Sequence, residues 1–183
     1  MAVSIRLGNA HNESDCDDLA RLRFAWRVTE RDLDGMAYEE FRARLGEWWR
    51  RHASSHRAFI AADGVDRADA GTAVGTDAGA AIGTAVGMAW LALIERVPGP
   101  DRFTRWGGSV QSVYVSAACR DRGIGRLLVD RVIAEARSAG LDWLILHPSE
   151  RSVWLYRRAG FAPSDQLLQL RPGADSCRAG PAL

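Results

Sequence analysis

Residues 108–140 read GSVQSVYVSAACRDRGIGRLLVDRVIAEARSAG and decide what kind of fold this chain adopts. The first part, 108–115, alternates as a strand does, which predicts Val110 and Tyr114 on one face of a sheet. From there the apolar residues recur at the period of a helix, and a glycine supplies a stop, which predicts a helix over 122–139. A strand, a glycine-containing loop and a long helix therefore follow one another directly.

The loop of this unit reads Arg120-Asp121-Arg122-Gly123-Ile124-Gly125-Arg126, with both glycines at the first turn of the expected helix. Glycines let backbone N–H groups come close to a ligand. The unpaired N–H groups of the first turn and the helix dipole then attract an anion such as a diphosphate. Three arginines add positive charge nearby. A Gly-x-Gly before a helix is also an ordinary turn, so the loop alone is weak evidence for phosphate binding.

The segments that follow predict three more elements. Residues 142–148 (DWLILHP) have the composition of a strand. Ser149 is expected to cap a short helix over 149–158, which ends at a glycine. Residues 161–170 (FAPSDQLLQL) are expected to form a final strand.

The N-terminal half predicts a strand, two helices and two further strands. These are expected as a strand at 3–8, a helix opened by a capping box at Ser14 and Asp17, a helix at 38–52, a strand at 56–62 and a strand from about residue 83. The Gly/Ala-rich stretch 65–82 is expected to be a flexible loop. The whole order is β-α-α-β-β-β-α-β-α-β.

Composition excludes several classes of protein. The chain has 183 residues, 47% hydrophobic and 26% charged, which predicts a single domain over 1–172 with a short tail at 173–183. Its 24 basic residues are all arginine and face 23 acidic ones, so no general basic field exists to hold nucleic acid or an anionic membrane. No apolar run is long enough to span a bilayer. Three scattered cysteines form no metal-ligand pattern and favour a reducing compartment, so we expect a cytoplasmic protein without a metal.

The ordered motifs resemble the GCN5-related N-acetyltransferase (GNAT) family. The stretch Arg120–Gly125 matches that family's [Q/R]-x-x-G-x-[G/A] pyrophosphate loop, and Leu155–Phe161 (LYRRAGF) matches its L-Y-x-x-x-G-F motif. The clear resemblance covers residues 83–170, and the N-terminal half matches more loosely. It implies an α/β fold with a mixed, mostly antiparallel, twisted sheet of about six or seven strands flanked by about four helices.

The resemblance implies acetyl-CoA as the acetyl donor, bound where two strands splay apart. Backbone groups of Val113, Tyr114 and Val115 would pair with the pantetheine amides like an added strand. Many relatives have an asparagine where this chain has Ser149, whose hydroxyl either bonds the cofactor arm or only caps a helix. The diphosphate would lie on the loop formed by Arg120, Asp121, Arg122, Gly123, Ile124, Gly125 and Arg126.

The implied reaction is direct attack of a primary amine on the thioester through a tetrahedral intermediate. Tyr156 is the expected general acid for the leaving thiolate, although a tyrosine in such a helix can also be plain core. Many relatives carry a glutamate base at the position of Ser109, and this chain has none there. Glu95 is our candidate base, and Glu30 and His147 are further candidates.

Two other interpretations remain open from the sequence. The missing glutamate allows an idle acetyl-CoA-binding sensor or regulatory module. An unrelated nucleotide-binding protein is disfavoured because a chain without lysine has no Walker motif. The acceptor amine has no readable code, and homodimerisation through the exposed final strand is expected only by analogy.

Overall fold

A computed structural model describes residues 3–30, 35–64 and 83–170. The expected flexible loop at 65–82 and the tail at 173–183 lie outside the described residues. Along the chain the elements are β1 (Val3–Leu7), α1 (Glu13–Glu30), α2 (Tyr38–His52), β2 (His56–Asp63), β3 (Thr84–Glu95), β4 (Trp106–Val115), the 3₁₀ turn η2 (Ala117–Cys119), α3 (Ile124–Ser138), β5 (Leu144–Ile145), the 3₁₀ turn η3 (Glu150–Ser152) and α4 (Val153–Arg158).

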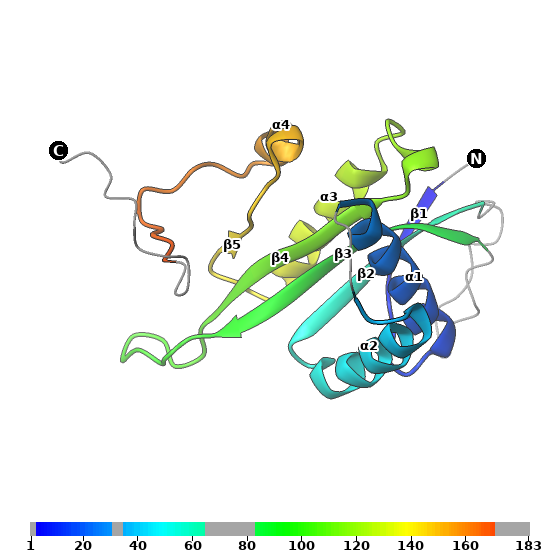
Figure 1. The fold of residues 1–183 in the computed structure, drawn as a ribbon. Helices are drawn as coiled ribbons and strands as arrows, with labels where there is room; N and C mark the ends of the chain where they lie inside the picture. The colour runs from blue at the N-terminus through cyan, green and yellow to red at the C-terminus, as the bar shows by residue number, and fades with distance from the viewer. Residues whose placement is uncertain (1–2, 31–34, 65–82, 171–183) are drawn as a thin grey trace, which may run out of the picture.

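The described strands form one sheet in the order β1-β2-β3-β4-β5. The first three pairings are antiparallel and β4–β5 is parallel, so the expected mixed, mostly antiparallel sheet is confirmed. Figure 1 shows α1 and α2 in front of this sheet and α3 behind it. The described sheet has five strands and not six or seven.

The missing strand is the final one, which was predicted over 161–170. These residues have no strand structure. Pro163 has no N–H to give to a ladder, and the Gln166 N–H bonds to Ser164 Oγ at 3.2 Å in a local turn. Leu168 and Leu170 are 94% and 84% exposed, because no described neighbour covers them.

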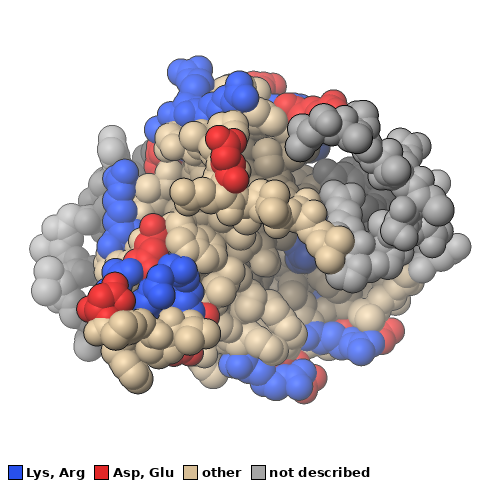
Figure 2. Space-filling model, turned by 90° about the vertical axis from the view of Figure 1, so that its left-hand side faces the viewer, with Lys and Arg blue, Asp and Glu red and all other residues tan. Residues whose placement is uncertain are grey.

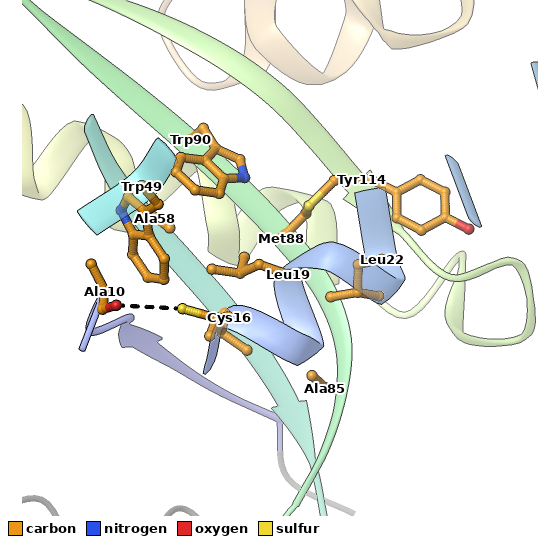
Figure 3. Packing of buried hydrophobic residues seen from close by; sticks show 11 residues of the cluster. Ala10, Cys16, Leu19, Leu22, Trp49, Ala58, Ala85, Met88, Trp90 and Tyr114 are labelled. Atoms are coloured by element: carbon orange, nitrogen blue, oxygen red, sulfur yellow. Dashed lines mark hydrogen bonds between the residues drawn. The ribbon is translucent and has the colours of Figure 1, made fainter. Parts of the chain in front are cut away.

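Two hydrophobic clusters hold the helices to the two faces of the sheet. On the α1–α2 face, helix side chains pack against β2 and β3, as Figure 3 shows; the cluster includes Leu19, Leu22, Trp49, Met88 and Trp90. On the α3 face the cluster includes Phe59, Leu91, Ile124, Leu128 and Val132. Because both faces are covered, β2 and most of β3 are buried.

A β-bulge in β4 changes which residues face the two layers. Trp90 pairs with Gln111, but the next pair is Met88 with Tyr114, so one residue of β3 opposes two of β4. Ser112 takes a left-handed φ of 55° there. A bulge adds one residue to the alternation, and Val110 therefore packs in the α3-side cluster while Tyr114 packs in the other. The prediction that they share a face is wrong for this reason.

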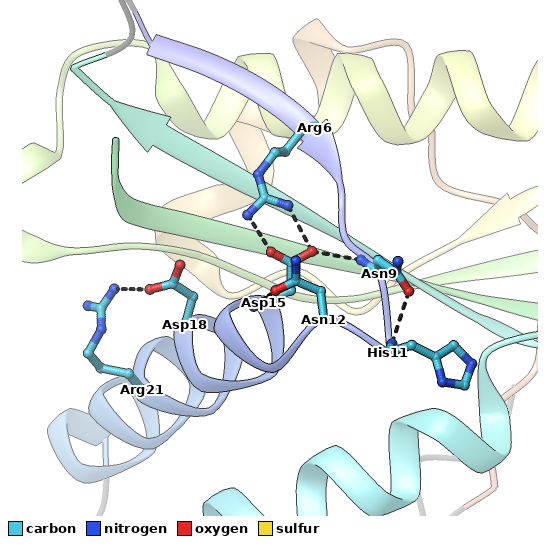
Figure 4. Close-up of polar contacts among 7 residues, drawn as sticks. All are labelled: Arg6, Asn9, His11, Asn12, Asp15, Asp18 and Arg21. Carbon is cyan, nitrogen blue, oxygen red and sulfur yellow. Dashed lines mark hydrogen bonds and ion pairs between the residues drawn. The ribbon is translucent and has the colours of Figure 1, made fainter. Parts of the chain in front are cut away.

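The start of α1 is fixed by a polar network, shown in Figure 4. Asn12 is the cap, since its Oδ1 accepts the Asp15 N–H at 3.1 Å, so the predicted box at Ser14 is two residues out of place. The Asp15 carboxylate accepts hydrogen bonds from both terminal nitrogens of the Arg6 guanidinium, at 2.8 and 2.5 Å, and from the Asn9 N–H at 2.8 Å. This network joins β1 to α1, the helix that reaches the candidate site.

Candidate functional site

A cleft opens where β4 and β5 stop pairing. The two strands are bonded only at Gly108 with Leu144 and at Ser109 with Ile145. Beyond these pairs the edge of β4 is free. A pocket of about 390 Å³ lies along this edge, and a second pocket of about 400 Å³ adjoins the first at Val115 and Arg120. The expected splaying of these two strands is therefore present.

The first pocket lies between the bulged end of β4 and α4. Its walls come from five parts of the chain: β4, the loop that leads into α3, the segment after β5, α4 and α1. Its lining includes Ser112, Val113, Tyr114, Val115, Leu146, His147, Ser149, Tyr156 and Trp26. Trp26 stacks on Tyr114, with ring centroids 6.3 Å apart, and so closes the α1 side.

The second pocket lies at the N-terminus of α3, where Gly123 is the N-cap residue. Gly123 has φ 76° and ψ 1°, a left-handed conformation that favours glycine. A Cβ built on it would meet nothing within 4 Å, so this backbone faces open space. The first-turn N–H groups of α3 have no partner within the helix. Together with Asp121, Ile124 and Gly125, Gly123 lines the pocket.

The three loop arginines differ in how their charge is used. Arg122 donates to both carboxylate oxygens of Asp63 on β2, at 2.6 and 3.1 Å, and it lines neither pocket. That hydrogen bond lowers the pKa of Asp63. Arg126 lines the second pocket but is bonded to Asp130 at 2.7 Å and to the Arg158 carbonyl at 2.9 Å.

Arg120 is the loop arginine whose charge remains for a ligand. It lines both pockets, its Nε donates to the Val115 carbonyl at 3.3 Å, and no ion pair includes it within the described ranges. The sequence predicted that all three arginines add positive charge near an anion site. In the structure, Arg122 and Arg126 instead bind acidic residues of the chain itself and thereby anchor the loop.

Tyr156 lies on α4 and lines the first pocket opposite β4. Its ring packs edge-on against Phe161, with centroids 5.9 Å apart and planes at 81°. Burial raises the pKa of its hydroxyl above the usual value, so the group stays protonated at neutral pH. A half-buried phenol in this position can donate a proton to a group in the cleft.

The predicted base residues are not brought together. Glu95 pairs with Trp106 at the far end of the β3–β4 hairpin, seven residues along β3 from Met88, which is roughly 23 Å at strand spacing. It lines neither pocket, so its predicted catalytic role has no geometric support. Glu30 ends α1, and its side chain lies outside the described residues. His147 does line the first pocket.

Ser149 lines the first pocket but does not cap a helix with its side chain. Its hydroxyl lies 2.9 Å from the Ser152 hydroxyl, which also bonds to the Ser149 carbonyl. The predicted helix over 149–158 is instead the turn η3 followed by α4. The sequence left two roles open for the Ser149 hydroxyl, a bond to the cofactor arm or a helix cap. The structure shows no side-chain cap, so the bond to the cofactor arm stays as the prediction.

Sequence reasoning missed one wall of the site. Trp154 on α4 lines both pockets and is 61% exposed. It directly precedes the LYRRAGF motif, and nothing in the residue pattern distinguishes it from an ordinary surface residue. Arg23 is a second residue that was not predicted for the site; it lies at helical spacing with Leu19, Leu22 and Trp26. The available signal was that it is the charged residue among apolar ones at that spacing.

The side of the molecule that bears the β3–β4 hairpin carries surface charge of mixed sign. Figure 2 shows this side: uncharged residues fill its centre, and Arg, Asp and Glu lie mainly around its margin, often next to one another. This face therefore offers no continuous basic track in its described part. No helix within 3–30, 35–64 and 83–170 is long and apolar enough to cross a membrane.

Comparisons with known proteins give one family. Residues 35–161 match the model of the Acetyltransferase (GNAT) family. Serotonin N-acetyltransferase 2, chloroplastic, of Oryza sativa subsp. japonica is 28% identical over 150 residues, which are 79% of this chain and 64% of that protein. The chain thus spans less than two thirds of the length of this relative.

Solved structures share the fold. A predicted acetyltransferase of Clostridium acetobutylicum, crystallised with acetyl-CoA, matches with a TM-score of 0.61 at 17% identity, over 93% of this chain and 96% of that one. Glucosamine-6-phosphate N-acetyltransferase of Arabidopsis thaliana matches with a TM-score of 0.63 at 15% identity, over 96% and 100% of the two chains. The expected resemblance to the GNAT family is confirmed. The alternative of an unrelated nucleotide-binding protein is therefore rejected.

Proposed function

This chain belongs to the Acetyltransferase (GNAT) family, and from that premise we propose that it transfers the acetyl group of acetyl-CoA to a primary amine. The observation that carries the proposal is the cleft itself. Its two pockets join an anion-attracting helix start to a free strand edge, and Tyr156 stands opposite that edge. An acetyl-CoA molecule has the same three parts in the same order: a diphosphate, an amide-bearing arm and a thioester.

The residues of the cleft fit such a donor. The first-turn N–H groups of α3 and the Arg120 guanidinium would hold the diphosphate. Backbone groups of Val113, Tyr114 and Val115 would pair with the amides of the arm as an added strand does. Ser149, across the cleft, would offer its hydroxyl to the same arm. Acetyl-CoA supplies an activated acyl group, and the chain positions it.

The chain's own groups would then manage one bond exchange. The amine lone pair forms the new C–N bond at the thioester carbonyl, and the C–S electron pair leaves on sulfur. A backbone N–H of Val115 or a neighbour would stabilise the oxyanion of the tetrahedral intermediate. Tyr156 would give its proton to the thiolate, and the nitrogen loses one proton, so the products are the N-acetyl compound and free CoA.

None of the carboxylates whose side chains the structure describes is placed to remove the amine proton. No Asp or Glu among the described residues lines the first pocket, and Ser109 and Gln111 stand where a base was expected. His147 lines that pocket and carries an imidazole, the side chain suited to proton transfer near neutral pH. We assign the proton to His147 or to water beside it.

Binding of acetyl-CoA is the first measurement, and Gly123 provides a sharp test of its site. Asn and Asp have the same size, and both tolerate the left-handed conformation and the N-cap position. Gly123→Asn should therefore retain much of the affinity, whereas Gly123→Asp adds a negative charge at the diphosphate and should abolish binding. Isothermal titration calorimetry of wild type and both variants, with ATP and NAD as controls, measures this.

Two results of that titration would reject the proposal. Absence of acetyl-CoA binding by the folded wild type would remove the donor. Equal affinity of the Asp and Asn variants would move the diphosphate away from α3.

The absence of a carboxylate base near Ser109 favours one second candidate, an idle acetyl-CoA sensor. Such a module would bind acetyl-CoA and release no CoA with any amine. Turnover of a broad amine panel, followed by the appearance of free thiol, separates the two functions.

We also propose that the protein acts in a reducing compartment such as the cytoplasm, because Cys16 and Cys119 are free cysteines.

A further inference from the structure

A third cavity, of about 240 Å³, lies between the helices α1 and α2 and the bulge of β4. It is lined by Arg23, Leu45, Trp48, Trp90, Gln111 and Ser112. Ser112 also lines the first pocket of the cleft, so the two spaces meet at the bulge. A molecule in this cavity would lie beside the free edge of β4, on the side opposite α4.

Arg23 brings to this cavity a positive charge that no carboxylate of the described residues pairs with. Two other part-buried arginines have carboxylate partners: Arg6 pairs with Asp15 and Arg57 with Glu135. Within the described ranges no ion pair includes Arg23. Its guanidinium donates to Ser112 Oγ and lies 5.8 Å from the Trp26 ring centroid. Burial, and secondarily the charge of Arg27, lowers the pKa of Arg23.

A second donor in the cavity wall lacks an acceptor. The indole Nε1 of Trp90 is buried and has no hydrogen-bond partner among the described residues. A buried donor without an acceptor costs free energy. The remaining wall, from Leu45 and the rings of Trp48 and Trp90, suits an apolar or aromatic body.

From these observations we propose that the acceptor is a free amino acid with an apolar or aromatic side chain, whose carboxylate binds Arg23. This inference rests on the proposed acetyl transfer. A guanidinium fork matches a carboxylate in shape and charge. No acidic residue of the described chain lines the cavity, so an amine without an anionic group meets only the positive charge of Arg23. The α-amino group of the bound amino acid would then reach the thioester past the bulge.

The test compares amines that differ only in the carboxylate. Phenylalanine with phenethylamine, leucine with 3-methylbutylamine, and tryptophan with tryptamine are such pairs. Steady-state kcat/KM is measured for each at saturating acetyl-CoA, with free CoA as the readout. We expect each amino acid to exceed its decarboxylated partner by about 10- to 100-fold, the ratio typical of a hydrogen bond to a charged group.

Variants assign the preference to Arg23. Arg23→Gln should remove most of it by raising KM for the amino acids, and Arg23→Lys should restore only part, because an ammonium lacks the fork. Arg44→Gln makes the same change of charge on an exposed pair with Glu40 and should keep the wild-type preference. Calorimetry with acetyl-CoA on every variant shows whether the donor site and the fold are intact.

The possible failures are distinguishable. If acetyl-CoA does not bind the wild type, the proposed function itself fails. If acetyl-CoA binds and the decarboxylated amines react as well as or better than the amino acids, the acceptor proposal is overturned while acetyl transfer stands. A preference that survives Arg23→Gln also overturns it, because the carboxylate is then bound elsewhere.

Discussion

Tyr156 is the single side chain on which the proposed chemistry depends most. Tyr156→Phe keeps the ring that packs against Phe161 and removes only the proton donor. We expect unchanged acetyl-CoA affinity and a kcat lower by about 10²- to 10⁴-fold, the usual contribution of a general acid. Because the pKa of Tyr156 is raised by burial, its ionisation should lower wild-type turnover only above about pH 10.

The control for this change is Tyr38→Phe, which removes the same atom from a ring packed edge-on against Phe24 and outside the cleft. Its turnover should equal that of the wild type. A Tyr156→Phe enzyme with the wild-type rate would exclude the hydroxyl as the acid.

At the residue scale, the sequence predicted those site residues that belong to local motifs. The helix-start glycines and Tyr156 have their positions set by a few neighbouring residues, and the structure places them around one cleft. The separate uses of Arg120 and Arg122 were not predictable, because the partner Asp63 lies 59 residues from Arg122. The distance between the bulge and Glu95, the predicted base, was not predictable either, since only strand register shows it.

The element that presents Arg23 and Trp26 to the site is α1, and its attachment to β1 depends on Asp15. This carboxylate is 3% exposed and holds both Arg6 and the Asn9 backbone. Asp15→Asn keeps the shape but leaves Arg6 without its counter-charge. We expect it to lower the free energy of unfolding by about 2–4 kcal/mol, less than a fully buried pair because Arg6 is part-exposed.

Urea unfolding measures this effect, with Asp18→Asn as the matched change on the same helix. Asp18 pairs with Arg21 at the surface, as Figure 4 shows, and its loss should cost no more than about 0.5 kcal/mol. Equal destabilisation by the two variants would show that the Arg6–Asp15 network adds nothing beyond a surface pair.

At the element scale, periodicity predicted α2 to its ends and α3 nearly so, because each helix has a strong apolar stripe and α3 is followed by a glycine. Alternation could not reveal the bulge at Ser112. A bulge depends on how β3 and β4 align, and Ser112 is not a glycine that would suggest a left-handed residue. The final strand failed for a related reason, since 161–170 alternates only loosely and has no described strand beside it.

The whole molecule ends, in its described part, on an open sheet edge beside exposed leucines. β5 is the last strand of the sheet, and a groove of about 330 Å³ runs along it between α4 and residues 161–167. Leu168 and Leu170 project beyond this groove into solvent. Apolar side chains at an unpaired sheet edge are typical of an interface between proteins. A second copy of the chain, related by a two-fold axis, would cover the groove and the two leucines of each copy.

We therefore predict a homodimer formed through this edge. Sedimentation equilibrium at micromolar concentration should give twice the mass of the chain for the wild type. The double variant Leu168→Glu, Leu170→Glu should give the mass of one chain, because two buried charges per copy oppose association. Val97→Glu is the control, since Val97 is equally exposed but lies on the β3–β4 hairpin. Acetyl-CoA binding by the double variant would show that it is folded. A monomeric wild type, or a double variant that still dimerises, would place the edge outside any interface between copies.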